Sequence, residues 1–174
     1  MATRPPPDTQ SAGGDGRSHP KQPALPPADA SWSIIHALTY GSLVLPSLIA
    51  AALWLKDPRW HDFLVTALLT HSALVVTFLG GMHWGIAMRY MATDARLPAF
   101  HFLWGPVPGY AAWFLLMAGP RMALIGMMVL TLWTFWVDHR TWPGSGLGPW
   151  MPLRRAFMLG SLFYSAIALA ALSL

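Results

Sequence analysis

The chain has 174 residues, of which 55% are hydrophobic and 10% are charged, and its formal net charge is +4. Soluble domains carry about 25% charged residues, so this composition argues against a water-soluble fold and for a lipid bilayer as the partner. The chain has no cysteine, which excludes disulfides, iron–sulfur clusters and cysteine nucleophiles, and it has no basic stripe or motif that indicates a nucleic-acid partner.

The first 31 residues form a segment of distinct composition. It contains seven prolines, and its only large apolar side chain after Met1 is Leu25. Such a segment buries too little apolar surface to offset the entropy of ordering, so we expect a disordered tail over residues 1–31. Residues 32–174 then form one transmembrane helical domain.

Five apolar runs follow the tail, and they predict an all-α fold, a polytopic transmembrane helical bundle. A membrane-spanning helix needs about 20 apolar residues, with a range of about 17 to 25. The second and fourth runs lack the polar stripe that a helix on the surface of a soluble protein shows. The fourth run is short, so the sequence leaves open whether it crosses the membrane fully. The expected spans are residues 32–55, 63–88, 98–118, 122–137 and 156–172.

The basic residues predict the orientation of the bundle. With five spans, eight Lys and Arg residues lie on the side of the N-terminus and three lie on the other side. Because cytoplasmic loops are enriched in Lys and Arg, we expect the N-terminus in the cytoplasm and the C-terminus outside.

The most distinctive motif lies in the second span, Phe78-Leu79-Gly80-Gly81-Met82-His83-Trp84-Gly85. Gly81 and Gly85 are four residues apart and share one face of a helix, a small-xxx-small pattern that lets two helices approach closely in lipid. Gly80 widens this smooth patch. We therefore expect a helix-packing centre formed by these three glycines.

His83 and Trp84 lie within the same motif, and an imidazole in a membrane helix needs a polar partner or a cavity. The simplest role for His83 is one interhelical hydrogen bond. The functional alternatives are a proton relay, a polar group for a substrate, and an axial haem ligand. Haem would require a second histidine from another helix, and His36 and His101 are expected near the same end of the bundle.

Two further groups of residues stand out in the later spans. In the third span, Pro106 and Pro108 lie between two glycines and remove two amide donors, which predicts a helix break or kink. Broken helices line binding sites in some transporters, but neighbouring helices also tolerate them as packing features. Asp138, Arg154 and Arg155 flank the last two spans, so we expect them at the membrane interface, where they hold topology or contact anionic lipid.

These features resemble an uncharacterised membrane family, the transmembrane protein 69 family (domain of unknown function 3429). The eight-residue motif of the second span looks like the family signature, and the third span is richer in helix breakers than the family pattern. The resemblance implies a small multi-helix protein of bacterial inner membranes or, for animal relatives, of mitochondria, and it implies no activity. Looser similarities extend it over residues 32–172: Tyr40-Gly41 with Leu45-Pro46, Pro106-Val107-Pro108 with Ala112-Trp113, and Asp138 with Trp150 and Leu153-Arg154.

The chain contains no phosphate loop, no Gly-x-Ser-x-Gly and no His-Glu-x-x-His motif, so the sequence identifies no catalytic, cofactor-binding or metal-binding residue. We expect a non-enzymatic component of the bacterial inner membrane, such as an assembly factor or accessory subunit, without a cofactor. Two alternatives stay open: a small-solute or proton carrier that uses His83 and the broken third helix, and a haem-binding redox protein. Besides the lipid bilayer, the expected partners are other membrane proteins or further copies of this chain.

Overall fold

The computed structural model describes residues 28–92 and 99–173 of the chain. Residues 1–27 of the predicted tail lie outside the described residues, and residues 28–31 already belong to the first helix. Within the described ranges the chain forms helices joined by turns and contains no strand, which confirms the all-α prediction.

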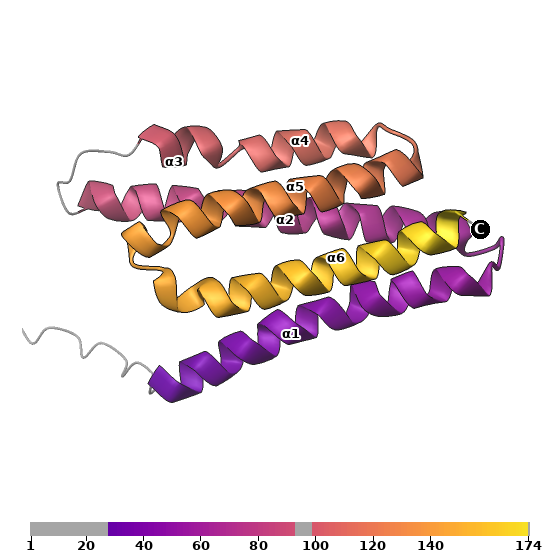
Figure 1. The fold of residues 1–174 in the computed structure, drawn as a ribbon, viewed down its shortest axis with the longest axis horizontal. Helices are drawn as coiled ribbons and strands as arrows, with labels where there is room; N and C mark the ends of the chain where they lie inside the picture. Colours follow the sequence, from indigo (N-terminus) through magenta and orange to yellow (C-terminus); the bar gives the residue numbers. More distant parts are fainter. Residues whose placement is uncertain (1–27, 93–98, 174) are drawn as a thin grey trace, which may run out of the picture.

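Six α-helices make up the described chain; the first two run in opposite directions, as do the last two (Figure 1). Three short 3-10 helices follow α1 or connect α5 to α6. The α-helices are α1 Ala28–Ala52, α2 His61–Ala92, α3 Ala99–Trp104, α4 Val107–Leu116, α5 Pro120–Thr141 and α6 Met151–Ser173; the 3-10 helices are η1 Leu53–Leu55, η2 Pro143–Ser145 and η3 Gly148–Trp150.

Four helical segments are long and apolar enough to cross a membrane, so the chain is a membrane protein. The expected fourth span is among them, because α5 continues through Asp138 to Thr141 and reaches 22 residues. The sequence placed its end at residue 137, since charged residues usually mark the end of a span. The four segments are Ser31–Leu55, His61–Tyr90, Pro120–Thr141 and Gly148–Ser173.

The expected third span is formed by two short helices that lie end to end, α3 and α4 (Figure 1). The helix is interrupted between Trp104 and Val107, where the proline at position 106 has no amide hydrogen to donate. The amide of Gly105 still donates to the carbonyl of His101 at 3.1 Å, so the first helix ends in regular geometry. At about 1.5 Å per residue, Ala99 to Leu116 extends over about 27 Å, close to the thickness of a bilayer core.

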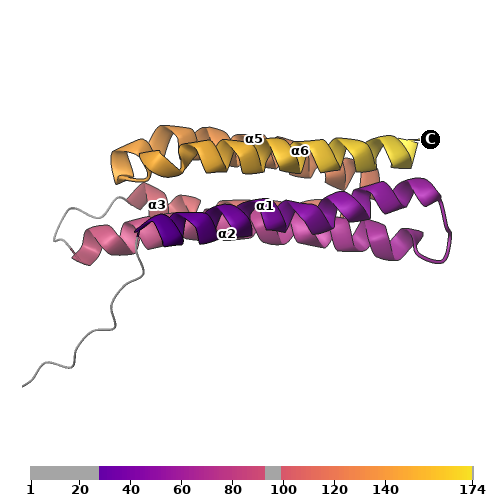
Figure 2. The same ribbon diagram turned by 90° about the horizontal axis from the view of Figure 1, so that it is seen from below.

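Helix α2 lies at the centre of the bundle, in contact with α1, α3, α4 and α5. Helices α5 and α6 pack side by side and form a layer over α1 and α2 (Figure 2). A large core cluster lies at the end of the bundle near the α1–α2 connection. Its buried members are Ala50, Leu53, Val65, Leu68, Leu69, Ala123, Leu124, Tyr164, Ala168 and Ala171.

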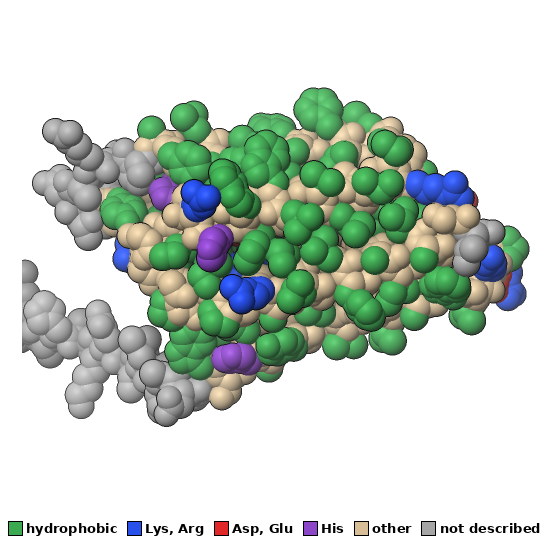
Figure 3. Space-filling model, viewed as in Figure 1, with side chains coloured by type: hydrophobic (Ala, Val, Ile, Leu, Met, Phe, Trp, Pro, Cys, Tyr) green, Lys and Arg blue, Asp and Glu red, His purple; other side chains and the backbone are tan. Residues whose placement is uncertain are grey.

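Large apolar side chains also cover the outer surface of the bundle, as Figure 3 shows for one face. They include Leu38, Phe78, Leu103 and Phe163, each of which exposes more than 60% of its surface. Soluble monomers rarely expose apolar surface on this scale, whereas lipid tails solvate it without cost. The surface therefore supports the assignment to a membrane.

Candidate functional site

The glycine motif of α2 and the proline break of the third span pack against each other. A Cβ atom added at Gly80 would collide with the backbone carbonyl oxygen of Gly105 and would crowd the ring of Pro108. One turn earlier on α2, the side chain of Thr77 lies against Gly109, where an added Cβ atom would come within 3.2 Å of Thr77 Cγ2. Two motifs that are separate in the sequence thus form one close contact between α2 and the α3–α4 junction.

The structure corrects the predicted packing face of the motif. Gly81 and Gly85 are exposed, and a Cβ atom added at either would meet nothing within 4 Å. Of the three glycines, Gly80 alone is buried and lies against the third span. Trp84 lies on the contacting side, with its indole against Gly105 and its Nε1 donating to the carbonyl of Phe102 at 3.0 Å. The packing centre therefore consists of Gly80 and Trp84.

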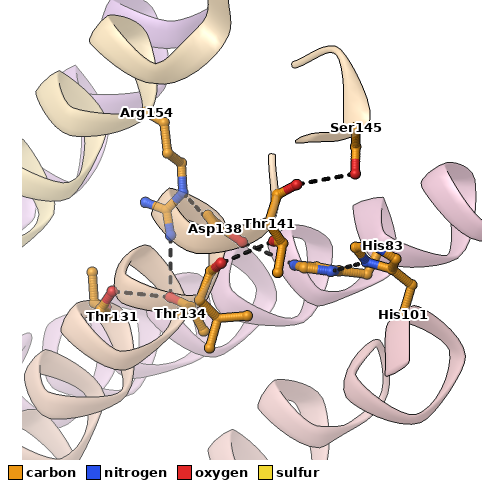
Figure 4. A network of polar contacts seen from close by, with 9 residues as sticks. His83, His101, Thr131, Thr134, Asp138, Thr141, Ser145 and Arg154 are labelled. Atoms are coloured by element: carbon orange, nitrogen blue, oxygen red, sulfur yellow. Dashed lines mark hydrogen bonds and ion pairs between the residues drawn. The ribbon is translucent and has the colours of Figure 1, made fainter. Parts of the chain in front are cut away.

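His83 is completely buried and uses both ring nitrogens (Figure 4). Its Nδ1 lies 2.8 Å from the Nδ1 of His101 on α3. Its Nε2 lies 2.9 Å from Oδ1 of Asp138 on α5. The histidine therefore connects three helices by two hydrogen bonds, and its side chain lies in the interior of the bundle.

Asp138 and Arg154 form a buried ion pair that continues this line of contacts. Arg154 Nε donates to Asp138 Oδ2 at 2.7 Å, and Arg154 Nη2 donates to the hydroxyl of Thr134 at 3.1 Å. The exposed fractions of Asp138 and Arg154 are 1% and 4%. The interfacial prediction is thus corrected for both side chains, because each charge is neutralised by the other, while Arg155 is exposed. We call the series His101, His83, Asp138, Arg154 and Thr134 the polar chain.

The hydrogen bonds of the two histidines run in one direction, from His101 to His83 and from His83 to Asp138. A carboxylate only accepts, so the proton between His83 and Asp138 belongs to His83 Nε2. In a neutral His83 the Nδ1 atom must then accept, and His101 Nδ1 must donate. Because the charges of Asp138 and Arg154 cancel, the interior is neutral when both histidines are neutral. The arrangement leaves His101 Nε2 as the atom at which the polar chain can take up a proton.

The end of α5 and the start of α6 meet at this site. Asp138 lies three residues before the end of α5, and Arg154 lies three residues after the start of α6. The connection between them folds over the end of the bundle, with the hydroxyl of Ser145 donating to the carbonyl of Thr141 at 3.0 Å. Trp142 begins this connection and is 2% exposed, and its carbonyl accepts from the amides of Ser145 and Leu147 at 3.0 and 2.9 Å. The polar chain is thus buried in the bundle and lies toward one end of it.

The geometry argues against haem ligation by His83 and its neighbours. Two imidazole nitrogens on opposite sides of one metal ion lie about 4 Å apart, since each bond is about 2 Å long. The 2.8 Å contact between His83 and His101 leaves no room for that. His36 lies apart, with Nδ1 2.8 Å from the carbonyl of Trp32. Among the residues that the structure describes, no three His or Asp side chains converge to hold a metal ion.

Sequence reasoning considered a pair of His83 and His101 but missed the contact with Asp138. The signal was present, because Asp138 is an acidic residue beside an apolar run and Arg154 stands at the start of the next. Charges at such positions either face water or neutralise each other inside the bundle. The sequence alone does not separate these two arrangements.

Comparison of the sequence with known proteins identifies its family. No curated protein and no solved structure matches the chain. The family model described as "Protein of unknown function (DUF3429)" matches residues 33–172, which include the glycine motif, the proline break and every member of the polar chain. The protein is therefore a member of the DUF3429 family.

Proposed function

We propose that this membrane protein is a proton carrier and that the polar chain binds the proton. The observation that carries the proposal is the single line of contacts from His101 through His83 to Asp138, at 2.8 and 2.9 Å, between side chains that are all buried in the bundle. Intramembrane ionisable groups are costly and commonly mark proton or substrate pathways.

The proposed uptake proceeds by transfer along existing hydrogen bonds. A proton binds His101 Nε2, and the hydrogen on His101 Nδ1 moves to Nδ1 of His83. His83 is then a cation, and its Nε2–H still donates to Asp138. The carboxylate stabilises this cation at 2.9 Å, which lowers the cost of a buried positive charge. Release is the reverse of these steps, so no other reactant is required.

A purely structural role accounts less well for the polar chain. An interhelical hydrogen bond in a membrane contributes only about 0.6 to 2 kcal/mol. Burying two opposite charges has a desolvation cost that their attraction often fails to exceed. A helix bundle that needed only stability could use apolar side chains at Asp138 and Arg154. The accessory or assembly role expected from the sequence stays a prediction, and no contact between the described residues favours it.

The setting of the carrier is part of the proposal. We place it in the bacterial inner membrane with the N-terminus in the cytoplasm, as the distribution of Lys and Arg indicates. In this orientation the polar chain lies near the cytoplasmic surface, where α1 begins and α5 ends (Figure 1). We also propose, from the sequence motifs, a relation to the transmembrane protein 69 family; this relation implies no activity.

Proton flux into liposomes tests the proposal. The purified protein is reconstituted with a trapped pH-sensitive dye, and a membrane potential drives protons inward. Glutamine at position 83 keeps hydrogen bonds but carries no exchangeable ring proton, so His83→Gln should lower the flux by about 100-fold, as loss of a proton-transfer group does.

The matched control is His36→Gln, because His36 is exposed on α1 and its Nδ1 contacts only a backbone carbonyl. This variant should conduct like the unaltered protein. Equal flux in the two variants would show that the polar chain does not carry protons, and the proposed function would be wrong.

A further inference from the structure

A second group of buried polar side chains lies deeper in the bundle. Ser72 on α2 and Ser161, Tyr164 and Ser165 on α6 are each no more than 6% exposed. The hydroxyl of Tyr164 lies beside the hydroxyls of Ser72 and Ser161. Polar groups at this depth are costly in a membrane protein, and the uptake steps described above do not use them.

The register of α5 against α6 connects this group to the polar chain. Two contacts fix the antiparallel register: Asp138 with Arg154 at one end, and Arg121 with the carbonyl of Leu172 at the other. In this register Thr131 lies level with Ser161. Arg154 and Ser161 are seven residues apart and share one face of α6, at a spacing of about 10 Å along the helix.

One buried polar atom along this face, Arg154 Nη1, lacks a direct hydrogen-bond partner among the described residues. The hydroxyl of Ser161 is also buried, and only the hydroxyl of Tyr164 lies beside it. The hydroxyls of Thr134 and Thr131 line the opposing helix, and Thr134 already accepts from Arg154. Buried polar atoms without a protein partner are commonly satisfied by internal water.

We infer that water molecules bind between α5 and α6, from Arg154 Nη1 to the hydroxyl of Tyr164, and extend the proton path to the middle of the membrane. The inference rests on the proposed proton function for its purpose. His83 Nε2 passes its proton to Asp138, Asp138 passes one to the first water, and each water in turn exchanges one O–H bond for another. The proton ends on the last water, as a hydronium ion hydrogen-bonded to the hydroxyl of Tyr164, about 15 Å along α6 from Arg154.

An apolar plug closes the bundle beyond Tyr164. The core cluster continues toward the far end with side chains that neither donate nor accept hydrogen bonds, so a proton cannot pass without movement of the helices. The path is therefore open toward one surface only, as a carrier requires and a channel does not. The plug consists of Leu53, Val65, Leu68, Leu124 and Ala168.

Hydroxyl-radical labelling by X-rays tests the water directly in the full chain in nanodiscs. Radicals form from water, so a buried side chain is oxidised only where water lies beside it. We expect oxidation of Tyr164, which is 1% exposed, and none of Met127, which is also 1% exposed but lies in the apolar cluster of Ala73, Val76, Ala112 and Leu130. In Ser161→Val the oxidation of Tyr164 should fall to the level of Met127.

Each other result overturns the inference. Absence of label on Tyr164 would show that no water binds there. Equal labelling of Tyr164 and Met127 would show general opening of the bundle. Should Ser161→Val fail to fold, Thr131→Val removes the opposing hydroxyl and must give the same loss. Failure of the proton function is seen separately. Unchanged flux in His83→Gln, with Tyr164 still labelled, would show that water binds beside Tyr164 but that the polar chain does not carry protons.

Discussion

Removing one partner of the ion pair between Asp138 and Arg154 should destabilise the bundle far more than removing both. In Asp138→Asn the interior gains a net charge of +1, because Arg154 stays protonated in a site where it is 4% exposed. The amide can accept from Arg154 or from His83, but its NH₂ group then faces the other donor. Breaking a buried pair in this way costs about 3–5 kcal/mol.

The double variant Asp138→Leu with Arg154→Met removes both charges and fills the space with apolar side chains. The remaining cost is the lost acceptor of His83 Nε2, about 1–3 kcal/mol. We therefore expect the free energy of unfolding of the double variant to be about 2 kcal/mol higher than that of Asp138→Asn.

Reversible unfolding in mixed micelles, followed by far-ultraviolet circular dichroism, measures this difference. The control is Asp62→Asn, since the side chain of Asp62 is fully exposed at the other end of the bundle. If the double variant is no more stable than Asp138→Asn, Asp138 and Arg154 do not neutralise each other in the interior, and the buried ion pair is refuted.

Three further results are expected. Gly80→Ala should lower the free energy of unfolding by up to about 2 kcal/mol, since overpacking costs about 1–3 kcal/mol and the gain in helix propensity offsets about 1 kcal/mol of it. Gly81→Ala, at an open neighbouring position, should be neutral or stabilising, and equal melting temperatures of the two variants would refute the contact with Gly105. Thr134→Val should cost about 1 kcal/mol in the same unfolding assay, because Arg154 Nη2 loses its acceptor. His101→Asn should lower the proton flux as much as His83→Gln does. A flux equal to that of the unaltered protein would show that the proton is taken up at an atom other than His101 Nε2.

The helical bundle was predictable because hydropathy identifies segments that lipid can solvate, but the ends of two spans were not. Asp138 and Arg154 looked like terminal charges, because a charge next to an apolar run usually faces water. Each lies inside its helix because the other neutralises it across a distance of 2.7 Å. The partner of a buried charge depends on how helices are placed in space, which hydropathy does not describe.

The packing face of α2 was misassigned for a related reason. This helix is apolar on all sides, so hydropathy does not separate its inner face from its lipid face. The spacing of Gly81 and Gly85 indicated that they share a face but not which face it was. Gly80 is one residue, or about 100° of rotation, away from Gly81, and that rotation decides which glycine meets the third span.

The break in the third span and the polar chain belong to one arrangement. Gly80 meets the carbonyl of Gly105 at the break, and His83 follows Gly80 by three residues, or nearly one turn, on the same side of α2. The short helix α3 ends at this break and carries His101, whose Nδ1 reaches His83 at 2.8 Å. Because the close backbone contact sets how near α3 can approach α2, it also sets the length of the hydrogen bond between the two histidines. A side chain at position 80 would therefore push apart the two groups that exchange the proton, and it would slow the relay by distance even where the bundle stays folded.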